Sequence, residues 1–337
     1  MAVVNRRIML VARPVGYPRL SDFHLVYAPV PAPEAGEVLV RSVYLSLDPD
    51  LRARMSETGA GEAPMAIGEV VTGGAVGLVV ESRDPEFRIG DAVVGILGWQ
   101  EYAVAPGRAL RRVDPDLAPI STALGVLGLP GLTAYFGLLE VCDPRRGETV
   151  VVSGATGGVG MLVGQIAKIR GCRAVGVAGA GAASAWLLDE LGFDAVLDFE
   201  PAGDSEVALR ELCPDGIDVY FDNVGGAVTD AVLHRVNPGA RIVVCGQLPR
   251  HDVEKPDLGP PWLGQLIDKQ AKVEVFQVSA HAQHFPDGRE QLAVWLRQGR
   301  LKYREVVAQG LEAAPKAFIE LLHGRNEGKQ LVKLSES

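Results

Sequence analysis

Small residues dominate one stretch in the middle of the chain, SGATGGVG at residues 153–160. It follows the apolar run 149–152 and precedes a helical pattern, so it lies where a strand passes into a helix. Gly154, Gly157 and Gly160 recur at every third position, and glycine permits positive φ angles and close approach of the backbone to a ligand. The first amides of a helix carry the positive end of its dipole, which favours a phosphate group. The alternative is a turn that is merely tight.

The elements around this loop decide between the two interpretations, because apolar runs alternate with helical patterns from about Leu117 onward. We expect strands at 149–152, 174–178, 195–199, 217–221, 241–245 and 273–278. We expect helices at 159–170, 182–191, 207–212, 227–235 and 289–298. This alternation predicts an α/β fold, a doubly wound parallel sheet covered on both faces. A glycine loop after the first strand of such a unit predicts a bound dinucleotide.

The first 120 residues have a different pattern. Short strand-like runs at 37–43, 75–81 and 92–97 are separated by many glycine and proline residues. Many short strands with such turns predict a barrel-like β domain. The chain becomes strand-like again near its end, at 330–334.

Composition limits the class of protein and its partners. The chain has 337 residues, 47% of them hydrophobic, and its formal net charge is −9. An acidic chain without a basic cluster argues against nucleic acid or an anionic membrane as the main partner. The first residues lack an apolar signal-peptide core, and no run approaches the ~18 apolar residues of a membrane span. We therefore expect a cytoplasmic protein with four reduced cysteines.

The end of the second expected strand is where the ribose of a dinucleotide should lie. There the sequence reads VAGAGAAS, residues 177–184. It contains no Asp or Glu that could bind the ribose hydroxyls, and no Lys or Arg that could pair with a 2′-phosphate. The chemistry of these residues therefore leaves NAD and NADP unresolved.

Several stretches together resemble one family: LSLDPDLRARM (45–55), GEVVTGGAVGLVVES (68–82), GWQEYAV (98–104), GLPGLTAYFGLLEV (128–141), GQIAKIRGC (164–172), GIDVYFDNVGG (216–226) and GKQLV (328–332). They resemble the zinc-independent medium-chain dehydrogenase/reductases, in the branch of leukotriene B4 12-hydroxydehydrogenase/prostaglandin reductase. Plant alkenal double-bond reductases and bacterial curcumin-type reductases belong to the same branch. The resemblance covers nearly the whole chain.

The resemblance implies two domains with a cofactor between them. A GroES-like β-barrel domain would comprise residues 1–120, joined by the C-terminal segment 305–337, and a Rossmann domain would comprise residues 121–304. Members of the branch reduce the C=C bond of α,β-unsaturated aldehydes and ketones with NADPH. Hydride goes to the β-carbon, charge develops on the carbonyl oxygen, and a proton reaches the α-carbon. We accordingly expect an NADP-dependent ene-reductase of small to medium conjugated carbonyls that forms a homodimer. NAD is the other possible cofactor.

The resemblance also assigns residues by position. The loop of Thr156, Gly157, Gly158, Val159 and Gly160 would hold the pyrophosphate. The nicotinamide and the rest of the cofactor would meet a second set: Asn223, Cys245, Gly246, Gln247, Phe276, Val278 and Asn326.

Four positions depart from the family pattern. The phosphate-pairing lysine of the family falls at Ala183 and a nearby tyrosine at Phe199, so both usual 2′-phosphate contacts are missing. An active-site tyrosine is replaced by Asp50, and a second tyrosine by His251.

These last two replacements give the catalytic candidates. His251 would take over hydrogen bonding or proton relay, because imidazole titrates near neutrality. The alternative is a solvent-facing loop histidine. Asp50 would repel substrates that bear a carboxylate, or it is a surface residue paired with Arg52 or Arg54.

No metal site is expected. The first cysteine is Cys142 and the chain has no His-Glu pair, so the ligands of the zinc-dependent relatives are missing. His281 and His284 are three residues apart, and we interpret them as part of an exposed turn. Two other functions stay open at this point. One is an NADPH:quinone reductase, and the other is a cofactor-binding sensor with little catalysis.

Overall fold

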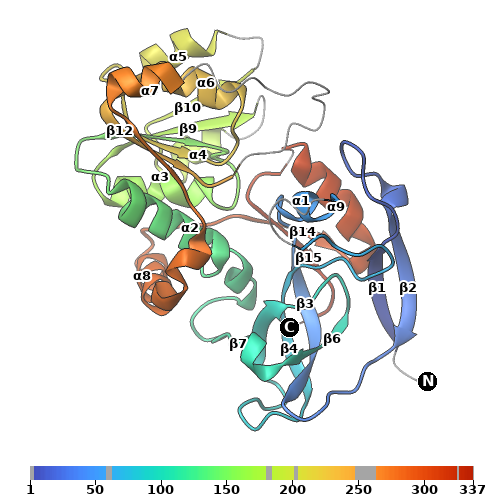
Figure 1. Cartoon of the computed structure of the whole chain (residues 1–337). Coiled ribbons are helices and arrows are strands. Elements are labelled where there is room, and N and C mark those ends of the chain that lie inside the picture. Colours follow the sequence, from blue (N-terminus) through green and yellow to red (C-terminus); the bar gives the residue numbers. More distant parts are fainter. Residues whose placement is uncertain are drawn as a thin grey trace. The chain divides into compact units, whose positions relative to one another are not determined.

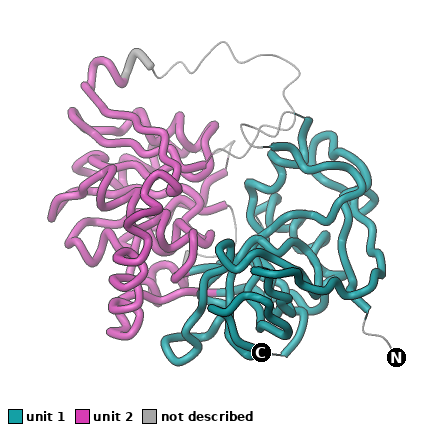
Figure 2. The backbone as a smooth tube through the Cα atoms, turned by 60° about the horizontal axis from the view of Figure 1, so that its bottom comes forward, with its two compact units in different colours: residues 1–125, 305–337 teal, residues 126–304 magenta. Residues whose placement is uncertain are grey.

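The structure is a computed structural model, and it describes residues 4–57, 63–179, 184–200, 204–246, 263–324 and 326–336. The chain divides into two compact units, coloured separately in Figure 2. One comprises Met1–Gly125 and Glu305–Ser337, and we call it the barrel unit. The other is Val126–Arg304, the Rossmann unit. The first boundary, which the sequence places after residue 120, falls after Gly125 in the structure.

The Rossmann unit is built on a parallel sheet of six strands in the order β10-β9-β8-β11-β12-β13. Every residue of the central strand β8 is buried, because helices cover both faces of such a sheet. This arrangement confirms the doubly wound fold expected from the sequence. The strands are β8 (Thr149–Ser153), β9 (Arg173–Gly179), β10 (Ala195–Phe199), β11 (Ile217–Asp222), β12 (Val236–Val244) and β13 (Lys272–Val275).

The helices of this unit lie on the two faces of the sheet. Figure 1 shows α5, α6 and α7 along one side and α2 and α3 along the other. The bounds are α2 (Leu129–Phe136), α3 (Gly160–Ile169), α4 (Ser184–Asp189), α5 (Ser205–Leu212), α6 (Ala227–Leu233), α7 (Leu263–Lys269) and α8 (Phe285–Arg297). A π-helical turn, Gly137–Cys142, continues α2 directly.

Strand order places the candidate site within this unit. The chain runs from β8 outward to β10 and then returns to the other side of β8 with β11. The direction of winding therefore changes between β8 and β11, and ligands of open α/β sheets bind outside the carboxyl ends of the strands at such a point. Those ends are Ser153 and Asp222.

The barrel unit contains a seven-stranded sheet in the order β14-β15-β3-β4-β5-β7, with β6 paired to β3. Its neighbours are antiparallel except β14 and β15, and a separate antiparallel ribbon is formed by β1 and β2. The strands are β1 (Val4–Leu10), β2 (Phe23–Pro29), β3 (Glu37–Ser46), β4 (Gly74–Ser82), β5 (Ala92–Ile96), β6 (Tyr102–Pro106), β7 (Arg111–Arg112), β14 (Glu305–Gln309) and β15 (Lys329–Lys333).

The end of the chain completes this unit. Strand β15 pairs with β3, with Leu331 opposite Ser46, so the C-terminal segment belongs to the same sheet as the first hundred residues. Helix α9 (Ala314–Leu322) contributes Phe318 to the core, where its ring meets Trp99 edge-on at 5.6 Å. Helix α1 (Leu51–Arg54) is a single turn that follows β3.

No described helix has the length and apolar character that crossing a bilayer requires.

Candidate functional site

The glycine loop joins β8 to α3 through a backbone that only glycine fits. Gly154 has φ +63°, in the left-handed region. A Cβ on Gly160 would lie 2.2 Å from the carbonyl oxygen of Gly154 and 2.8 Å from the Cα of Ala155. Because no side chain separates them, the first turn of α3 packs directly on the loop. The requirement for glycine at 154 and 160 is therefore steric as well as conformational.

The amides of this turn are arranged for an anion. The N–H groups of Met161 and Val163 donate to the carbonyl oxygens of Gly157 and Val159, both at 3.1 Å. Among the described residues, the amides of the three preceding positions have no backbone acceptor: Gly158, Val159 and Gly160. Three such amides at the positive end of a ten-residue helix suit a diphosphate. Thr156 lies half-buried in the same turn. The residues present therefore fit the phosphate part of a dinucleotide.

The carboxyl ends of β8 and β11 are tied together beside this loop. The backbone N–H of Asn223 donates to Ser153 Oγ at 2.9 Å, and Asn223 Nδ2 donates to the Ser153 carbonyl oxygen at 2.8 Å. Both bonds hold Asn223, half-buried, at the point where the winding direction of the sheet changes. This is where the sequence places a cofactor contact.

Directly before Asn223 lies Asp222, a carboxylate with no exposed surface. It accepts five hydrogen bonds, which together offset the cost of burying its charge. Oδ1 accepts from the hydroxyls of Ser153 and Tyr220 at 3.0 Å and the amides of Val224 and Gly225 at 3.1 and 2.9 Å, and Oδ2 accepts from the Thr229 hydroxyl at 2.7 Å.

The two residues that follow strand β12 also bond to Asp222. The amides of Cys245 and Gly246 donate to the main-chain carbonyl oxygen of Asp222 at 2.8 and 3.2 Å. Burial, with the Asp222 charge as a second cause, raises the pKa of the Cys245 thiol to about 12. Cys245 is therefore a neutral thiol at physiological pH and not a thiolate nucleophile. The next position assigned from the sequence, Gln247, lies outside the described residues, as does His251.

Phe276 and Val278 follow β13. Phe276 is 5% exposed and packs on the π-helical turn, where a Cβ on Gly137 would lie 3.3 Å from its ring. Val278 is half-buried and begins a 3-10 turn. The backbone of this segment, more than the Phe276 ring, is therefore what a ligand could meet.

The same turn holds the two histidines expected to be exposed. His284 is exposed, but His281 is not: its side chain keeps 23% of its surface and its ring stacks on Phe136. His281 Nδ1 lies 2.9 Å from Glu140 Oε2. No group of three or more His, Cys, Asp or Glu side chains that could hold a metal occurs among the described residues.

The remaining assigned residues belong to the barrel unit. Asp50 is exposed at the start of α1. Arg52, one of its expected ion-pair partners, is 6% exposed and donates to the carbonyl oxygens of Gly16 and Pro14. Asn326 is half-buried, and its Nδ2 donates to the carbonyl oxygen of Gly328 at 2.8 Å.

Two buried charges were missed by sequence reasoning. One is Asp222, and the other is Lys329, which is 4% exposed and donates to Asp48 Oδ1 and the Leu47 carbonyl oxygen, both at 2.7 Å. The available signal was the charge itself, since each lies at one end of a strand that carries adjacent apolar residues. The Lys329–Asp48 pair ties β15 to the segment that leads into α1 and Asp50.

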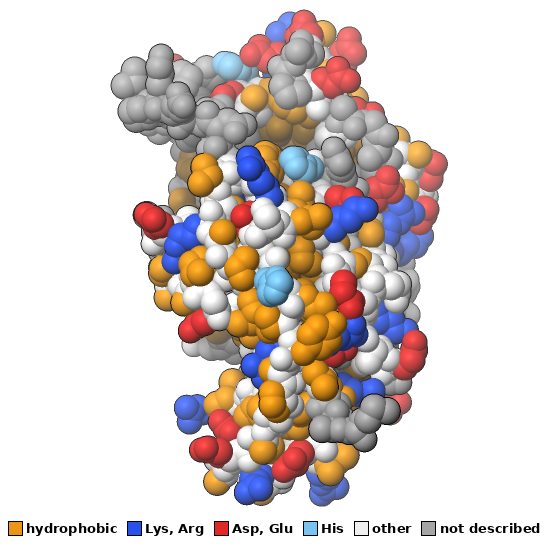
Figure 3. All heavy atoms as spheres, turned by 90° about the vertical axis from the view of Figure 1, so that its right-hand side faces the viewer, with side chains coloured by type: hydrophobic (Ala, Val, Ile, Leu, Met, Phe, Trp, Pro, Cys, Tyr) orange, Lys and Arg blue, Asp and Glu red, His pale blue; other side chains and the backbone are white. Residues whose placement is uncertain are grey.

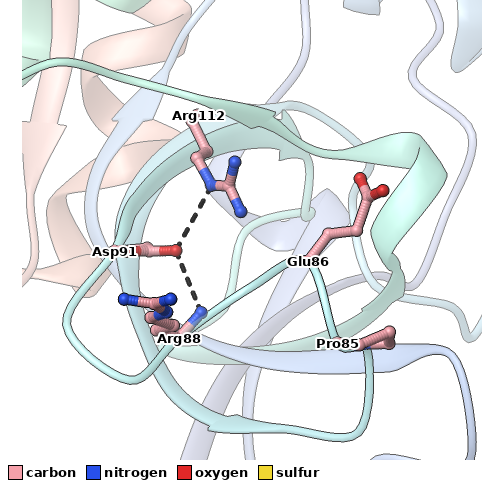
Figure 4. A pocket seen from close by; sticks show the side chains of 5 residues that line it. All are labelled: Pro85, Glu86, Arg88, Asp91 and Arg112. Carbon is pink, nitrogen blue, oxygen red and sulfur yellow. Dashed lines mark hydrogen bonds and ion pairs between the residues drawn. The ribbon is translucent and has the colours of Figure 1, made fainter.

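An open pocket of about 500 Å³ in the barrel unit does not have the features of a cofactor site. Figure 4 shows its lining, Pro85, Glu86, Arg88, Asp91 and Arg112. Arg112 Nε and the Arg88 amide both contact Asp91 Oδ2, at 3.3 and 2.9 Å. Acidic and basic groups thus pair with one another across an exposed surface.

Two family models match the chain. The N-terminal domain of oxidoreductase matches residues 6–113, and the zinc-binding dehydrogenase model matches residues 158–291. The two matches correspond to the barrel sheet and to the Rossmann sheet with its glycine loop.

Relatives match over almost the full length. The NADPH-dependent curcumin reductase of Escherichia coli is 42% identical, over 98% of this chain and 97% of that protein. The NADP(+)-dependent 2-alkenal reductase of Nicotiana tabacum is 41% identical, over 99% and 98%. The crystal structure of CurA from Vibrio vulnificus in complex with NADPH matches with a TM-score of 0.93 and 42% identity, over 98% of this chain and 100% of that chain. The chain therefore belongs to the zinc-independent medium-chain dehydrogenase/reductase family, in the branch of the curcumin, 2-alkenal and prostaglandin reductases.

Proposed function

We propose that this protein reduces the C=C bond of α,β-unsaturated aldehydes and ketones with NADPH. The observation that carries the proposal is the fit of the glycine loop and Asn223 to a dinucleotide, at the point where the winding of the sheet reverses. Two relatives that share about two-fifths of the sequence are named an NADPH-dependent curcumin reductase and an NADP(+)-dependent 2-alkenal reductase.

NADPH, when bound, supplies a hydride from its nicotinamide ring. The amides of Gly158, Val159 and Gly160 would hold its diphosphate, and Asn223 would contact the cofactor at the carboxyl end of β11. The conjugated carbonyl would gain the hydride at its β-carbon, and the π electrons would shift toward the carbonyl oxygen to give an enolate. The enolate would then take up a proton at its α-carbon. A donor near the carbonyl oxygen would lower the barrier, because charge develops there.

Asp50 and His251 are the proposed groups for the substrate side. His251 would hydrogen-bond the developing oxyanion or relay the proton, and Asp50 would disfavour substrates with a carboxylate. A His251→Phe variant tests the first role: kcat/KM for a small enone should fall at least tenfold, and an unchanged kcat/KM would remove His251 from the mechanism.

A preference for NADPH over NADH has to arise without the lysine and the tyrosine that contact the 2′-phosphate in relatives. Phe199 ends β10 half-buried and offers no phosphate donor, and Ala183 lies outside the described residues. The absent charge-assisted contact would cost about 1.5–3 kcal/mol. We therefore expect NADPH to be preferred over NADH by a smaller margin than in relatives that have the lysine.

We further infer a homodimer. Strand β13 is at the edge of the Rossmann sheet, and all four of its residues are exposed, with Val275 79% exposed. An edge strand of this kind can pair with the same strand of a second copy. Light scattering after gel filtration should show a dimer that Val275→Lys converts to a monomer. Val207→Lys, at an exposed valine of α5, should leave it intact; a monomeric wild-type protein contradicts the inference.

The environment we propose is the cytoplasm, with no nucleic acid or membrane partner. The four cysteines carry free thiols, as is usual in a reducing compartment. The face drawn in Figure 3 has acidic and basic side chains side by side, without the continuous basic surface that nucleic acid requires.

The function is tested by turnover of 3-nonen-2-one and of 1,4-naphthoquinone with NADPH and NADH in turn. We expect consumption of NADPH with the enone and formation of the saturated ketone. Turnover of the quinone alone would indicate a quinone reductase instead. Tight binding of NADPH without turnover of either compound would indicate a cofactor-binding sensor.

A further inference from the structure

We propose that Asp222 is a positioning residue of the cofactor site, acting through its hydrogen bonds and without contacting the cofactor itself. The inference rests on the proposed use of NADPH. Its basis is that three segments meet at one buried carboxylate: the end of β8, which is 69 residues away in sequence, the turn directly after β11, and helix α6.

The carboxylate reaches Asn223 through a single hydroxyl group. Ser153 Oγ donates to Asp222 Oδ1 at 3.0 Å and accepts from the Asn223 amide at 2.9 Å. The hydroxyl proton is thereby committed to the carboxylate, which leaves the oxygen lone pairs for the amide. Asn223 Nδ2 is held by the Ser153 carbonyl oxygen, while its Oδ1 accepts no hydrogen bond from the described residues. The network thus fixes the side-chain amide with its oxygen available to a ligand.

Asp222 also shapes the turn that follows. Its Oδ1 accepts from the amides of Val224 and Gly225, and Gly225 and Gly226 both have left-handed φ angles of +75° and +63°. The main-chain oxygen of Asp222 holds the amide of Gly246 at 3.2 Å. A Cβ on Gly246 would lie 3.2 Å from the Asn223 carbonyl oxygen, so the ends of β11 and β12 are in close contact. A displaced Asp222 would move both cofactor-facing strand ends.

A second aspartate on the same strand provides a matched control. Asp218 also joins β11 to β8, because its Oδ2 accepts from the Thr149 amide at 2.9 Å. Its Oδ1 accepts from Asn237 Nδ2 at 2.8 Å. Thr149 begins β8 and Ser153 ends it, so Asp218 makes the same kind of link at the amino end of the strands, away from the glycine loop. Substitution there disturbs the sheet without altering Asn223.

Two variants test the proposal in place of Asp222→Ala, which would remove the shared acceptor of five buried donors and destabilise the whole unit. Ser153→Ala removes the hydroxyl that links Asp222 to Asn223. Asp222→Asn keeps the shape and four donors on its oxygen, while its amide nitrogen faces Thr229. The dissociation constant of NADPH, from quenching of tryptophan fluorescence, should rise at least fivefold in both. With saturating NADPH, kcat for an enone should stay within twofold of wild type.

In Asp218→Asn the melting temperature should fall while the dissociation constant of NADPH stays within twofold of wild type. An unchanged dissociation constant in Ser153→Ala and Asp222→Asn overturns the proposal, and so does an equal rise in all three variants. Absence of enone turnover in the wild-type protein would refute the proposed reaction but not the positioning role, because cofactor binding is measured separately. A wild-type protein that fails to bind NADPH would refute both.

Discussion

The close packing of α3 on the glycine loop makes Gly160→Ala the most informative single substitution. The new Cβ would lie 2.2 Å from the Gly154 carbonyl oxygen, and both it and the nearby Ala155 Cα are backbone atoms. A carbon–oxygen contact needs at least about 3.2 Å, so the first turn of α3 must move by about 1 Å in a densely packed interior. The amides of Gly158, Val159 and Gly160 would then no longer point toward the same diphosphate.

The size of the effect follows from this displacement. Hydrogen bonds to a charged group contribute about 1.5–3 kcal/mol, so their loss should raise the dissociation constant of NADPH about ten- to a hundredfold. Overpacking should lower the free energy of unfolding by about 1–3 kcal/mol. Alanine gains at most about 1 kcal/mol over glycine in helix propensity, which offsets only part of that loss.

Gly164→Ala, on the same helix, separates the two effects. Its Cβ would lie 2.0 Å from the ring of Phe193, so it also strains α3, but one helical turn beyond the loop amides and against a side chain instead of the loop backbone. Calorimetric titration with NADPH and urea unfolding should be run on both variants. We expect both to lose stability and only Gly160→Ala to lose affinity. Equal affinities in the two variants would refute the diphosphate site at this loop.

Two further predictions concern groups buried in each unit. Burial raises the pKa of the Cys142 thiol to about 12, whereas an unfolded thiol has a pKa of about 8.5. Above the unfolded pKa only the unfolded chain loses this proton, so the free energy of unfolding falls as pH rises. Between pH 8 and 10 the free energy of unfolding of the wild type should fall by about 2 kcal/mol more than that of Cys142→Val, and equal slopes would contradict this. In the barrel unit, Lys329→Met should cost about 2 kcal/mol in urea unfolding, because the Leu47 carbonyl oxygen and Asp48 Oδ1 both lose the ammonium group that donates to them. Lys333→Met, at a lysine of the same strand that pairs with Glu336, should cause no measurable change, and equal losses would argue against the buried pair.

The Rossmann sheet was predictable because its strands carry their own signal. The runs 149–152 and 217–221 are almost entirely apolar, with Asp218 as the one charged residue, and that fits strands buried on both sides. The barrel unit was less visible. Strand β1 has two adjacent arginines, Arg6 and Arg7, which interrupt any apolar alternation. Helix α9 was missed although Ala314, Ala317 and Phe318 have helical spacing.

The site likewise has features that adjacent residues reveal and features that only the fold brings together. A glycine loop is local, so the loop at 153–160 could be assigned from adjacent residues. The hydrogen-bond network of Asp222 could not, because it needs Ser153, which is 69 residues away in sequence, and a fold of the turn and helix after β11 that brings Thr229 back to the same carboxylate. The same applies to His281, whose partner Glu140 is 141 residues away.

The central claim, transfer of hydride from NADPH to the β-carbon of a conjugated carbonyl, is tested most directly with NADPH that carries deuterium at C4 of the nicotinamide. A small enone is incubated with the protein and each labelled epimer in turn, and the product is examined by NMR. One epimer should give a saturated ketone with deuterium at the β-carbon and none at the carbonyl carbon. An allylic alcohol with deuterium at the carbonyl carbon, or no labelled product from either epimer, would contradict the claim.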